Sequence, residues 1–411
     1  MRPTQLLGTV NRDGQIIIVA RGLRTLAHGT ASVVLAIYLD LRGFSLAEIG
    51  LFLTAGGLGA AAWALVIGIV ADALGRRRML TLISLLAAAS GTALVVAPAY
   101  PILVAFGFLG AFTAMAGSSG AIVPLEQASI ATTTTPDHRT KVYAVLGIVG
   151  TTGVALGALG AGVPQILQGV FGVGEISSFQ VLFAAYAALS LGVAFLYSLL
   201  SPAVEVQEVE GRWSNPFRLP SRRHIFTLAS LFSVDSFGTG LVAQSLAAYF
   251  FFTRFGLDPQ SLGILFFVSS ILTAISMGVA VKLARSIGLV NTMVFTHLPS
   301  NVIMVVIPFV PWVWLAVALW IVRAFLSQMD VPTSQSYTMA IVGPEERAAM
   351  ASAGSVARNT GTAFGPSVAS VLWTAGSDTI PFVAGGLLKI AYDLTLWRLF
   401  VGVKPPEEVT R

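Results

Sequence analysis

The sequence predicts an all-α membrane protein with twelve transmembrane helices in two pseudo-symmetric halves of six. Charged residues make up 10% of its 411 residues and hydrophobic residues 55%, whereas roughly a quarter of an average soluble domain is charged. The third observation is a repeated cassette, Pro-x-x-Gln followed by Pro-x-x-Arg. Eight residues separate the glutamine from the second proline, and the two copies lie 208 positions apart, at Pro124, Gln127, Pro136 and Arg139 and at Pro332, Gln335, Pro344 and Arg347. A single repeat at half the chain length indicates two fused, related halves.

Apolar runs long enough to cross roughly 30 Å of hydrocarbon, separated by short polar connectors, define the helices. In the first half they are 16–40, 46–70, 79–98, 102–127, 141–165 and 179–201. In the second half they are 225–251, 260–284, 287–308, 311–335, 344–373 and 380–402. The predicted divisions are therefore an N-terminal half at 1–201, a cytoplasmic linker at 202–223 and a C-terminal half at 224–411.

Local residue types explain where several of these helices start and how they pack. Pro136 and Pro344, each followed by an acid, are expected in the first turn of the fifth and eleventh helices. Pro124 and Pro332 are expected inside the preceding helices, where they would bend them. The fifth and eleventh helices are rich in glycine, which allows close contact with neighbouring helices. Their glycines are Gly147, Gly150, Gly153, Gly157, Gly160 and Gly162, and Gly354, Gly361 and Gly365.

Arginine and lysine set the predicted orientation, because short cytoplasmic loops carry an excess of them. With both termini inside, the outer loops hold only Arg42 and Arg254. The predicted location is therefore the inner or plasma membrane, with both termini in the cytoplasm. The net charge of +5 comes from cytoplasmic loops and gives no reason to expect nucleic acid as a partner. The predicted partners are the lipid bilayer, protons and a small-molecule substrate, and the predicted functional form is a monomer.

The connector between the second and third predicted helices reads Gly68-Ile-Val-Ala-Asp72-Ala-Leu-Gly75-Arg76-Arg77. It resembles the signature loop of the major facilitator superfamily, G-x-x-x-D-R-x-G-R-R, except that Ala73 replaces the arginine after the aspartate. The resemblance implies the major facilitator fold and a secondary transporter that works by alternating access. It also implies that Asp72 latches the two halves together on the cytoplasmic side.

Ionisable residues inside the bilayer are the candidate functional groups, because each is costly to place there. Arg21, Arg24 and His28 share one face of the first helix. The resemblance implies that helices one, four, seven and ten line a central cavity, and most of these residues lie on those helices. The predicted proton-coupling residues are Asp235, Asp330 and Glu126. The predicted substrate-cavity residues are Arg24, His28, Arg323, Arg358, Asn359 and Gln328.

Other intramembrane charges are expected to be structural. Arg21 is close enough to the cytoplasmic end of its helix to extend its guanidinium to the interface. Lys389 and Asp393, four residues apart on the last helix, are expected to form an ion pair with each other. His297 is expected to be a packing histidine. Arg24 lies too deep to reach the interface and is expected to pair with Asp235 or Asp330, or to bind an anion.

These features together predict a proton-coupled transporter that exports a drug or metabolite. The alternative is a symporter, exchanger or uniporter of a small organic anion bound by the cavity arginines. An enzyme is not expected, because the four histidines lack metal-ligand spacing and no nucleophile set is apparent. No cofactor or metal is expected, and a channel is disfavoured by the two linked halves with an inner latch.

Overall fold

The computed structural model describes residues 11–96, 99–110, 112, 122–133, 136–205, 220–343 and 346–403. Within these ranges the ordered elements are helices and no residue lies in a β-strand. Nine helical stretches in this part of the chain are long and apolar enough to cross a membrane. The predicted fold class, an all-α membrane protein, is confirmed.

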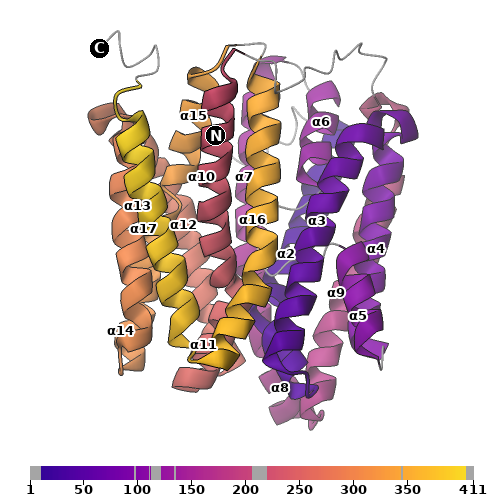
Figure 1. Ribbon diagram of the computed structural model, residues 1–411. Coiled ribbons are helices and arrows are strands. Elements are labelled where there is room, and N and C mark those ends of the chain that lie inside the picture. Colours follow the sequence, from indigo (N-terminus) through magenta and orange to yellow (C-terminus); the bar gives the residue numbers. More distant parts are fainter. Residues whose placement is uncertain are drawn as a thin grey trace. The chain divides into compact units, whose positions relative to one another are not determined.

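Each predicted helix overlaps one or two helices of the structure, labelled in Figure 1. Those of the first half are α2 (Arg12–Leu41), α3 (Leu46–Leu74), α4 (Arg76–Val96), α5 (Tyr100–Leu109), α6 (Val123–Thr133), α7 (Pro136–Leu159), α8 (Val163–Phe171) and α9 (Glu175–Ser198). Those of the second half are α10 (Arg222–Leu241), α11 (Gln244–Phe255), α12 (Pro259–Ile287), α13 (Leu289–Val306), α14 (Val313–Ser327), α15 (Asp330–Ala340), α16 (Arg347–Ala375) and α17 (Thr379–Phe400). Short 3-10 turns follow α7, α9 and α13, and the second of them is η2 (Pro202–Val204).

Within the described residues, three of the predicted long helices are interrupted. The fifth is divided between α7 and α8, the seventh between α10 and α11, and the tenth between α14 and α15. Pro124 and Pro332 were predicted to bend helix interiors, and this prediction is wrong. They lie in the first turns of α6 and α15, where a missing backbone N–H leaves no helical hydrogen bond unmade. Pro136 begins α7 as predicted.

By their contacts the helices form two compact units. Unit 1 comprises Met1–Glu210 with Gln244–Phe267, and unit 2 comprises Gly211–Ala243 with Val268–Arg411. In unit 1, α2 packs against α7, α9 and α11. In unit 2, α10 runs along α16 and α13 runs along α17 (Figure 1). Most of the predicted cytoplasmic linker at 202–223 lies outside the described residues.

Glycines bring helices together in both units, as predicted for the fifth and eleventh segments. A Cβ added to Gly157 of α7 would lie 2.1 Å from the carbonyl oxygen of Leu26 on α2. A Cβ on Gly365 of α16 would lie 2.3 Å from the Cα of Gly240 on α10. Gly147 has open space instead, so only some of the predicted glycines serve as contact points.

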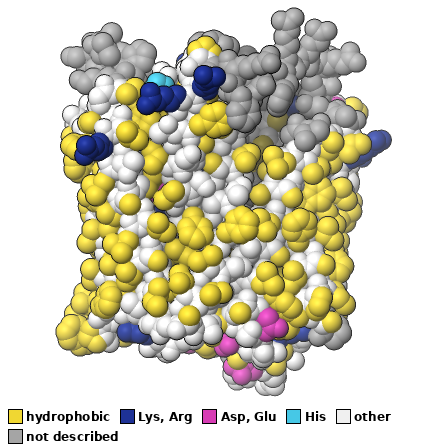
Figure 2. Space-filling model, in the orientation of Figure 1, with side chains coloured by type: hydrophobic (Ala, Val, Ile, Leu, Met, Phe, Trp, Pro, Cys, Tyr) yellow, Lys and Arg dark blue, Asp and Glu magenta, His cyan; other side chains and the backbone are white. Residues whose placement is uncertain are grey.

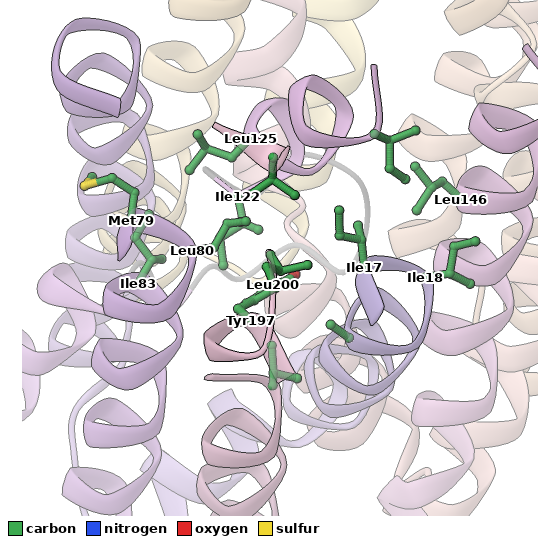
Figure 3. Packing of buried hydrophobic residues seen from close by; sticks show 14 of the residues in the cluster. Ile17, Ile18, Met79, Leu80, Ile83, Ile122, Leu125, Leu146, Tyr197 and Leu200 are labelled. Carbon is green, nitrogen blue, oxygen red and sulfur yellow. The ribbon is translucent and has the colours of Figure 1, made fainter. Parts of the chain in front are cut away.

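Apolar side chains cover the visible face of the molecule (Figure 2) and also form the core of unit 1. Figure 2 shows hydrophobic side chains across the middle of the visible face and arginine and lysine side chains toward its ends. Inside unit 1, aliphatic residues from several helices pack around Tyr197 of α9 (Figure 3). The labelled members are Ile17, Ile18, Met79, Leu80, Ile83, Ile122, Leu125, Leu146 and Leu200. This apolar cluster surrounds one of the polar sites described next.

Candidate functional site

Each unit holds a buried polar cluster. The arginine cluster of unit 1 consists of Arg21, Arg24, Glu126 and Tyr197. The acid cluster of unit 2 consists of Asp235, His297, Asn301, Asp330, Lys389 and Asp393. Buried charges in a membrane protein mark functional sites by default, because hydrocarbon does not solvate them.

In the arginine cluster, one carboxylate binds two guanidinium groups. Arg21 Nη1 donates to Glu126 Oε2 at 2.7 Å, and Arg24 Nη2 donates to Oε1 and Oε2 at 3.0 and 3.2 Å. The Tyr197 hydroxyl donates to Oε1 at 2.7 Å. Glu126 is fully buried, whereas the Arg24 side chain keeps 11% of its surface exposed. The cluster therefore carries one more positive charge than negative charge, with Arg24 its accessible member.

Local geometry explains how these residues meet. Arg21 and Arg24 lie about one turn apart on α2, so their side chains leave the same face. Gly150 of α7 makes room for Arg21, because a Cβ there would lie 2.9 Å from Arg21 Nε. The sequence left open whether Arg21 reaches the membrane interface or faces the interior with Arg24, and its contact with the buried Glu126 favours the interior. Arg24, expected to pair with an acid of the seventh or tenth segment, contacts Glu126 of its own unit instead.

His28 lies one turn beyond Arg24 on α2 and extends this polar face. Its Nε2 is 3.3 Å from the Tyr186 hydroxyl of α9, and the two rings meet edge to face. Phe112 covers both rings. A neutral imidazole hydrogen-bonded to a phenol can orient a substrate group without adding charge.

In the acid cluster, the shortest contact joins helices α10 and α17. Lys389 Nζ donates to Asp235 Oδ1 at 2.6 Å and to Thr239 Oγ1 at 2.8 Å. Gly238 and Gly385 allow the approach, since a Cβ on Gly238 would lie 2.8 Å from the Lys389 side chain. Asp235, predicted to couple protons, is therefore already paired with a lysine.

His297 of α13 lies between two carboxylates. Its Nδ1 is 2.8 Å from Asp393 Oδ1, and its Nε2 is 3.8 Å from Asp235 Oδ1. Asn301, one turn along α13, donates to Asp393 Oδ2 at 2.8 Å. A histidine placed in this way can take up a proton on one nitrogen and face an acid with each side of its ring.

Asp330 completes the acid cluster and is its least satisfied carboxylate. It is 7% exposed and interacts electrostatically with Asp235, His297 and Lys389. Among the described residues, no group donates a hydrogen bond to its side chain, whereas the other two acids of the cluster each have a donor within 2.8 Å. A buried carboxylate without a donor keeps the full cost of leaving water.

The remaining predicted cavity residues belong to unit 2, and one of them, Arg358, interacts electrostatically with Asp235 and Asp330. The Arg358 guanidinium lies 3.7 Å from the centroid of the Phe232 ring and donates to Ser334 Oγ at 3.1 Å. Arg323 lies 4.8 Å from the centroid of Trp320, and no carboxylate of the described chain is within ion-pair distance of it. Asn359 is half-buried on α16, and Gln328 lies at the interruption between α14 and α15.

The predicted latch is described in part. Gly75 ends α3 with φ of 92°, and the backbone N–H groups of Arg76 and Arg77 donate to Glu205 at 2.6 and 3.3 Å. Glu205 thus binds the amino end of α4, where a negative charge is favourable. The surroundings of Gly68 and the side chain of Asp72 lie outside the described part of the structure.

Sequence reasoning assigned only two of the six residues of the acid cluster, Asp235 and Asp330, to the functional site. Lys389 and Asp393 were expected to pair with each other, and this is wrong, because Lys389 binds Asp235 and Asp393 binds His297 and Asn301. His297, expected to be a packing residue, links two acids. The available signal was the co-occurrence of an intramembrane lysine, histidine and three acids in one half of the chain.

The comparisons with known proteins agree with this architecture. A family model described as Major Facilitator Superfamily matches residues 17–366. The chain belongs to this superfamily. It is also similar to the uncharacterised membrane protein YJR124C of Saccharomyces cerevisiae, at 24% identity over 425 residues, which covers 96% of this chain and 95% of that protein.

Two solved structures show the same fold. The nucleoside transporter NupG matches with a TM-score of 0.75 and 15% identity, over 95% of this chain and 99% of that one. A bacterial homologue of the human lysosomal transporter Spinster, in an inward-facing and unoccupied conformation, matches with a TM-score of 0.73 and 14% identity, over 94% and 97%. Membership of the superfamily and these neighbours indicate a transporter rather than an enzyme.

Proposed function

We propose that the protein is a secondary active transporter that moves a small molecule by alternating access and couples this movement to protons. The observation that supports coupling is the position of His297 between Asp393 and Asp235, with Lys389 bound to Asp235 at 2.6 Å. Three buried acids in this cluster share one lysine and one histidine. With His297 neutral, the acids outnumber the lysine by two, so proton uptake lowers the electrostatic cost of burial.

Asp330 and His297 are the proposed proton-binding groups of this cluster. Asp330 lacks a hydrogen-bond donor and therefore gains most from protonation. A proton on His297 would strengthen its contacts with Asp393 and Asp235. A rearrangement of the Lys389–Asp235 pair would change the charge beside His297 and therefore its affinity for that proton. Proton binding is coupled to a conformational change when the proton affinity of a group depends on contacts that the change breaks or forms. The linked groups of this cluster meet that requirement.

The substrate prediction has two forms, and the arrangement favours one of them. Export of a drug or metabolite relied on free acids in the cavity, but Asp235 is neutralised by Lys389. The small organic anion is favoured by the arginine cluster, where two arginines share Glu126. The direction of transport, the cell membrane as location, cytoplasmic termini and a monomeric state remain predictions of the sequence.

The test is solute-driven proton movement. The purified protein is reconstituted into liposomes that contain a pH-sensitive dye, and organic anions and lipophilic cations are added in turn. We expect a subset of solutes to change the internal pH, and Asp235→Asn and Asp330→Asn each to abolish this change. At least one of the two variants should retain exchange of labelled solute, and Asp258→Asn, in an exposed connector, should behave as wild type.

Transport that proceeds without proton movement in the wild-type protein would contradict coupling. Proton movement that persists in both aspartate variants would remove the acid cluster from the mechanism. In the first case a uniporter becomes the better description of the protein.

A further inference from the structure

The arginine cluster holds guanidinium N–H groups for which no acceptor is present among the described residues. Arg21 and Arg24 contribute two charges, and Glu126 contributes one of opposite sign. The Nε atoms of both arginines are buried and have no hydrogen-bond partner in the described chain. Unused guanidinium donors inside an apolar cluster are costly, so their retention points to a ligand that completes them.

Side chains from four helices contact Glu126 or the two residues that follow it on α6. Arg21 and Arg24 approach from α2 and Tyr197 from α9. From α4, Arg76 Nη1 donates to the carbonyl oxygen of Ala128, and from α7 the Tyr143 hydroxyl donates to that of Gln127. In the described part of the chain, Glu126 is therefore the single acid in contact with the two buried arginines.

We propose that the arginine cluster binds the anionic group of the substrate and that Glu126 takes up one proton when this group binds. The proposal rests on the function proposed above and names its substrate class, a small molecule with a carboxylate or similar oxyanion. Arginine suits this role, because its planar fork binds a carboxylate through two parallel hydrogen bonds.

Charge balance links the proton to the anion. Before binding, two arginines and an ionised Glu126 give a net charge of plus one. After a monoanion and a proton enter, two arginines, a neutral Glu126 and the anion again give plus one. An anion entering without a proton would lie next to an ionised carboxylate, and the two would repel each other. Anion and proton therefore each raise the affinity for the other.

The exposure pattern indicates which residue the substrate meets first. Arg24 is the exposed member at 11%, whereas Arg21 is 5% exposed and Glu126 is fully buried. The substrate therefore contacts Arg24 first. Glu126, which is fully buried and bound to Arg24, takes up the proton without being the first contact. His28, one turn further along α2 and bound to Tyr186, is placed to orient the uncharged part of the same molecule.

The experiment measures binding by the purified full-length protein in detergent, with no membrane and no gradient. Thermal stabilisation by benzoate, acetate and inorganic phosphate is compared with stabilisation by choline, at an acidic and at a neutral pH. At least one anion should stabilise the protein, and choline should not. If one proton binds with each anion, the anion affinity should rise by up to about tenfold for each pH unit by which the pH is lowered.

Three variants test the roles of the residues. Arg24→Gln should abolish stabilisation by the anion, whereas Arg254→Gln, an exposed arginine of the same unit, should leave it unchanged. Glu126→Gln should bind the anion at neutral pH as tightly as the wild type does at acidic pH. Tyr197→Phe removes one hydrogen bond to the ionised carboxylate and should move the pH midpoint of binding upward by about one unit.

The Tyr197→Phe variant keeps both arginines and Glu126, so the test survives if Glu126→Gln fails to fold. No stabilisation by any of the three anions, or stabilisation that does not depend on pH, overturns the inference. Because this assay involves no transport, its failure leaves proton-coupled transport intact. Anion binding in a protein that moves no protons would instead contradict the proposed function alone.

Discussion

At the scale of single residues, the hydrogen-bond partner of each buried carboxylate determines what that carboxylate can do. Glu126 and Asp235 are each bound to cations, Asp393 is bound to His297 and Asn301, and Asp330 has no donor in the described chain. The charge of a carboxylate bound to cations is balanced, whereas a buried carboxylate without a donor keeps the full cost of leaving water. The four acids therefore differ in role although all lie in apolar surroundings.

Removal of Lys389 should expose this difference. Lys389→Met leaves Asp235 as an uncompensated buried charge and should lower stability by about 3–5 kcal/mol. The double variant Lys389→Met with Asp235→Asn should regain most of that loss. Lys282→Met, at an exposed position of α12, is the matched control and should have little effect. Thermal unfolding in one detergent measures all three, and a double variant as unstable as Lys389→Met would show that the pair is not the source of stability.

Buried ionisable residues can be identified from the sequence more readily than the residues with which they pair. Asp235, Asp330 and Arg24 could be selected because an ionisable side chain in an apolar run is costly. The Lys389–Asp235 contact joins residues 154 positions apart, and spacing along one helix carries no information about such a contact. Lys389 and Asp393 share a helix face, but each reaches a different neighbouring helix, and so the predicted local pair does not form.

At the scale of elements, hydropathy predicted where helices lie but not where they are interrupted. Val242 and Ala243 between α10 and α11 are as apolar as the helices around them, and Gln328 and Met329 separate α14 from α15. A helix can stop inside an apolar run when neighbouring groups satisfy its freed backbone. The composition of the run alone does not show this.

The turn between α3 and α4 combines a glycine with a capping acid. Gly75 has φ of 92°, and a Cβ there would lie 3.0 Å from a carboxylate oxygen of Glu205. Gly75→Ala should cost about 1–3 kcal/mol for the backbone conformation and about 1 kcal/mol more for displacing the cap. Gly43→Ala, at φ of 83° with open space around its Cβ position, should show only the backbone cost. Equal unfolding temperatures for the two variants would mean that Glu205 moves without penalty.

Glu346 holds the start of α10 in unit 2. Its carboxylate accepts hydrogen bonds from Ser221 N and Ser221 Oγ at 2.9 and 2.6 Å, and these bonds lower the pKa of Glu346 below its ordinary value of 4.5. A lowered pKa in the folded state adds stability above the ordinary value, and this stability disappears as pH falls through the lowered one. Glu346→Gln should therefore be less stable than wild type by about 1 kcal/mol at neutral pH.

The difference between the two proteins is the quantity to measure, because other groups titrate in both. Unfolding temperatures are recorded from neutral pH downward for wild type and Glu346→Gln. The gap should stay constant above pH 4.5 and close below it. A gap that widens as pH falls would reverse the assigned sign and exclude the hydrogen bonds as its source.

At the scale of the whole molecule, the signature loop predicts that Asp72 takes part in the transport cycle. Asp72→Asn keeps the shape of the side chain and removes its charge, so it should slow transport with little change in unfolding temperature. Asp258→Asn is a suitable control, because Asp258 caps the start of α12 through Ser261 and asparagine caps helices equally well. Turnover in proteoliposomes at normal protein amounts, unchanged in Asp72→Asn, would exclude the latch.

The repeat in the sequence and the division into compact units do not coincide. Gln244–Phe267 is encoded in the second half yet packs within unit 1, where Ser245 Oγ donates to the carbonyl oxygen of Ser32 at 2.8 Å. The chain therefore passes from one unit to the other at three places: after Glu210, after Ala243 and after Phe267. The last of these lies inside the unbroken helix α12.

The last two of these passages differ in local structure. Residues 242 and 243 form an irregular joint between two helices, which can absorb rotation through a few backbone torsions. Helix α12 has no such joint and resists stretching, because each turn is closed by hydrogen bonds. The segment Gln244–Phe267 is therefore joined to the rest of the chain in two different ways. At its start the backbone torsions of an irregular joint can change, and at its end a continuous helix keeps a fixed length.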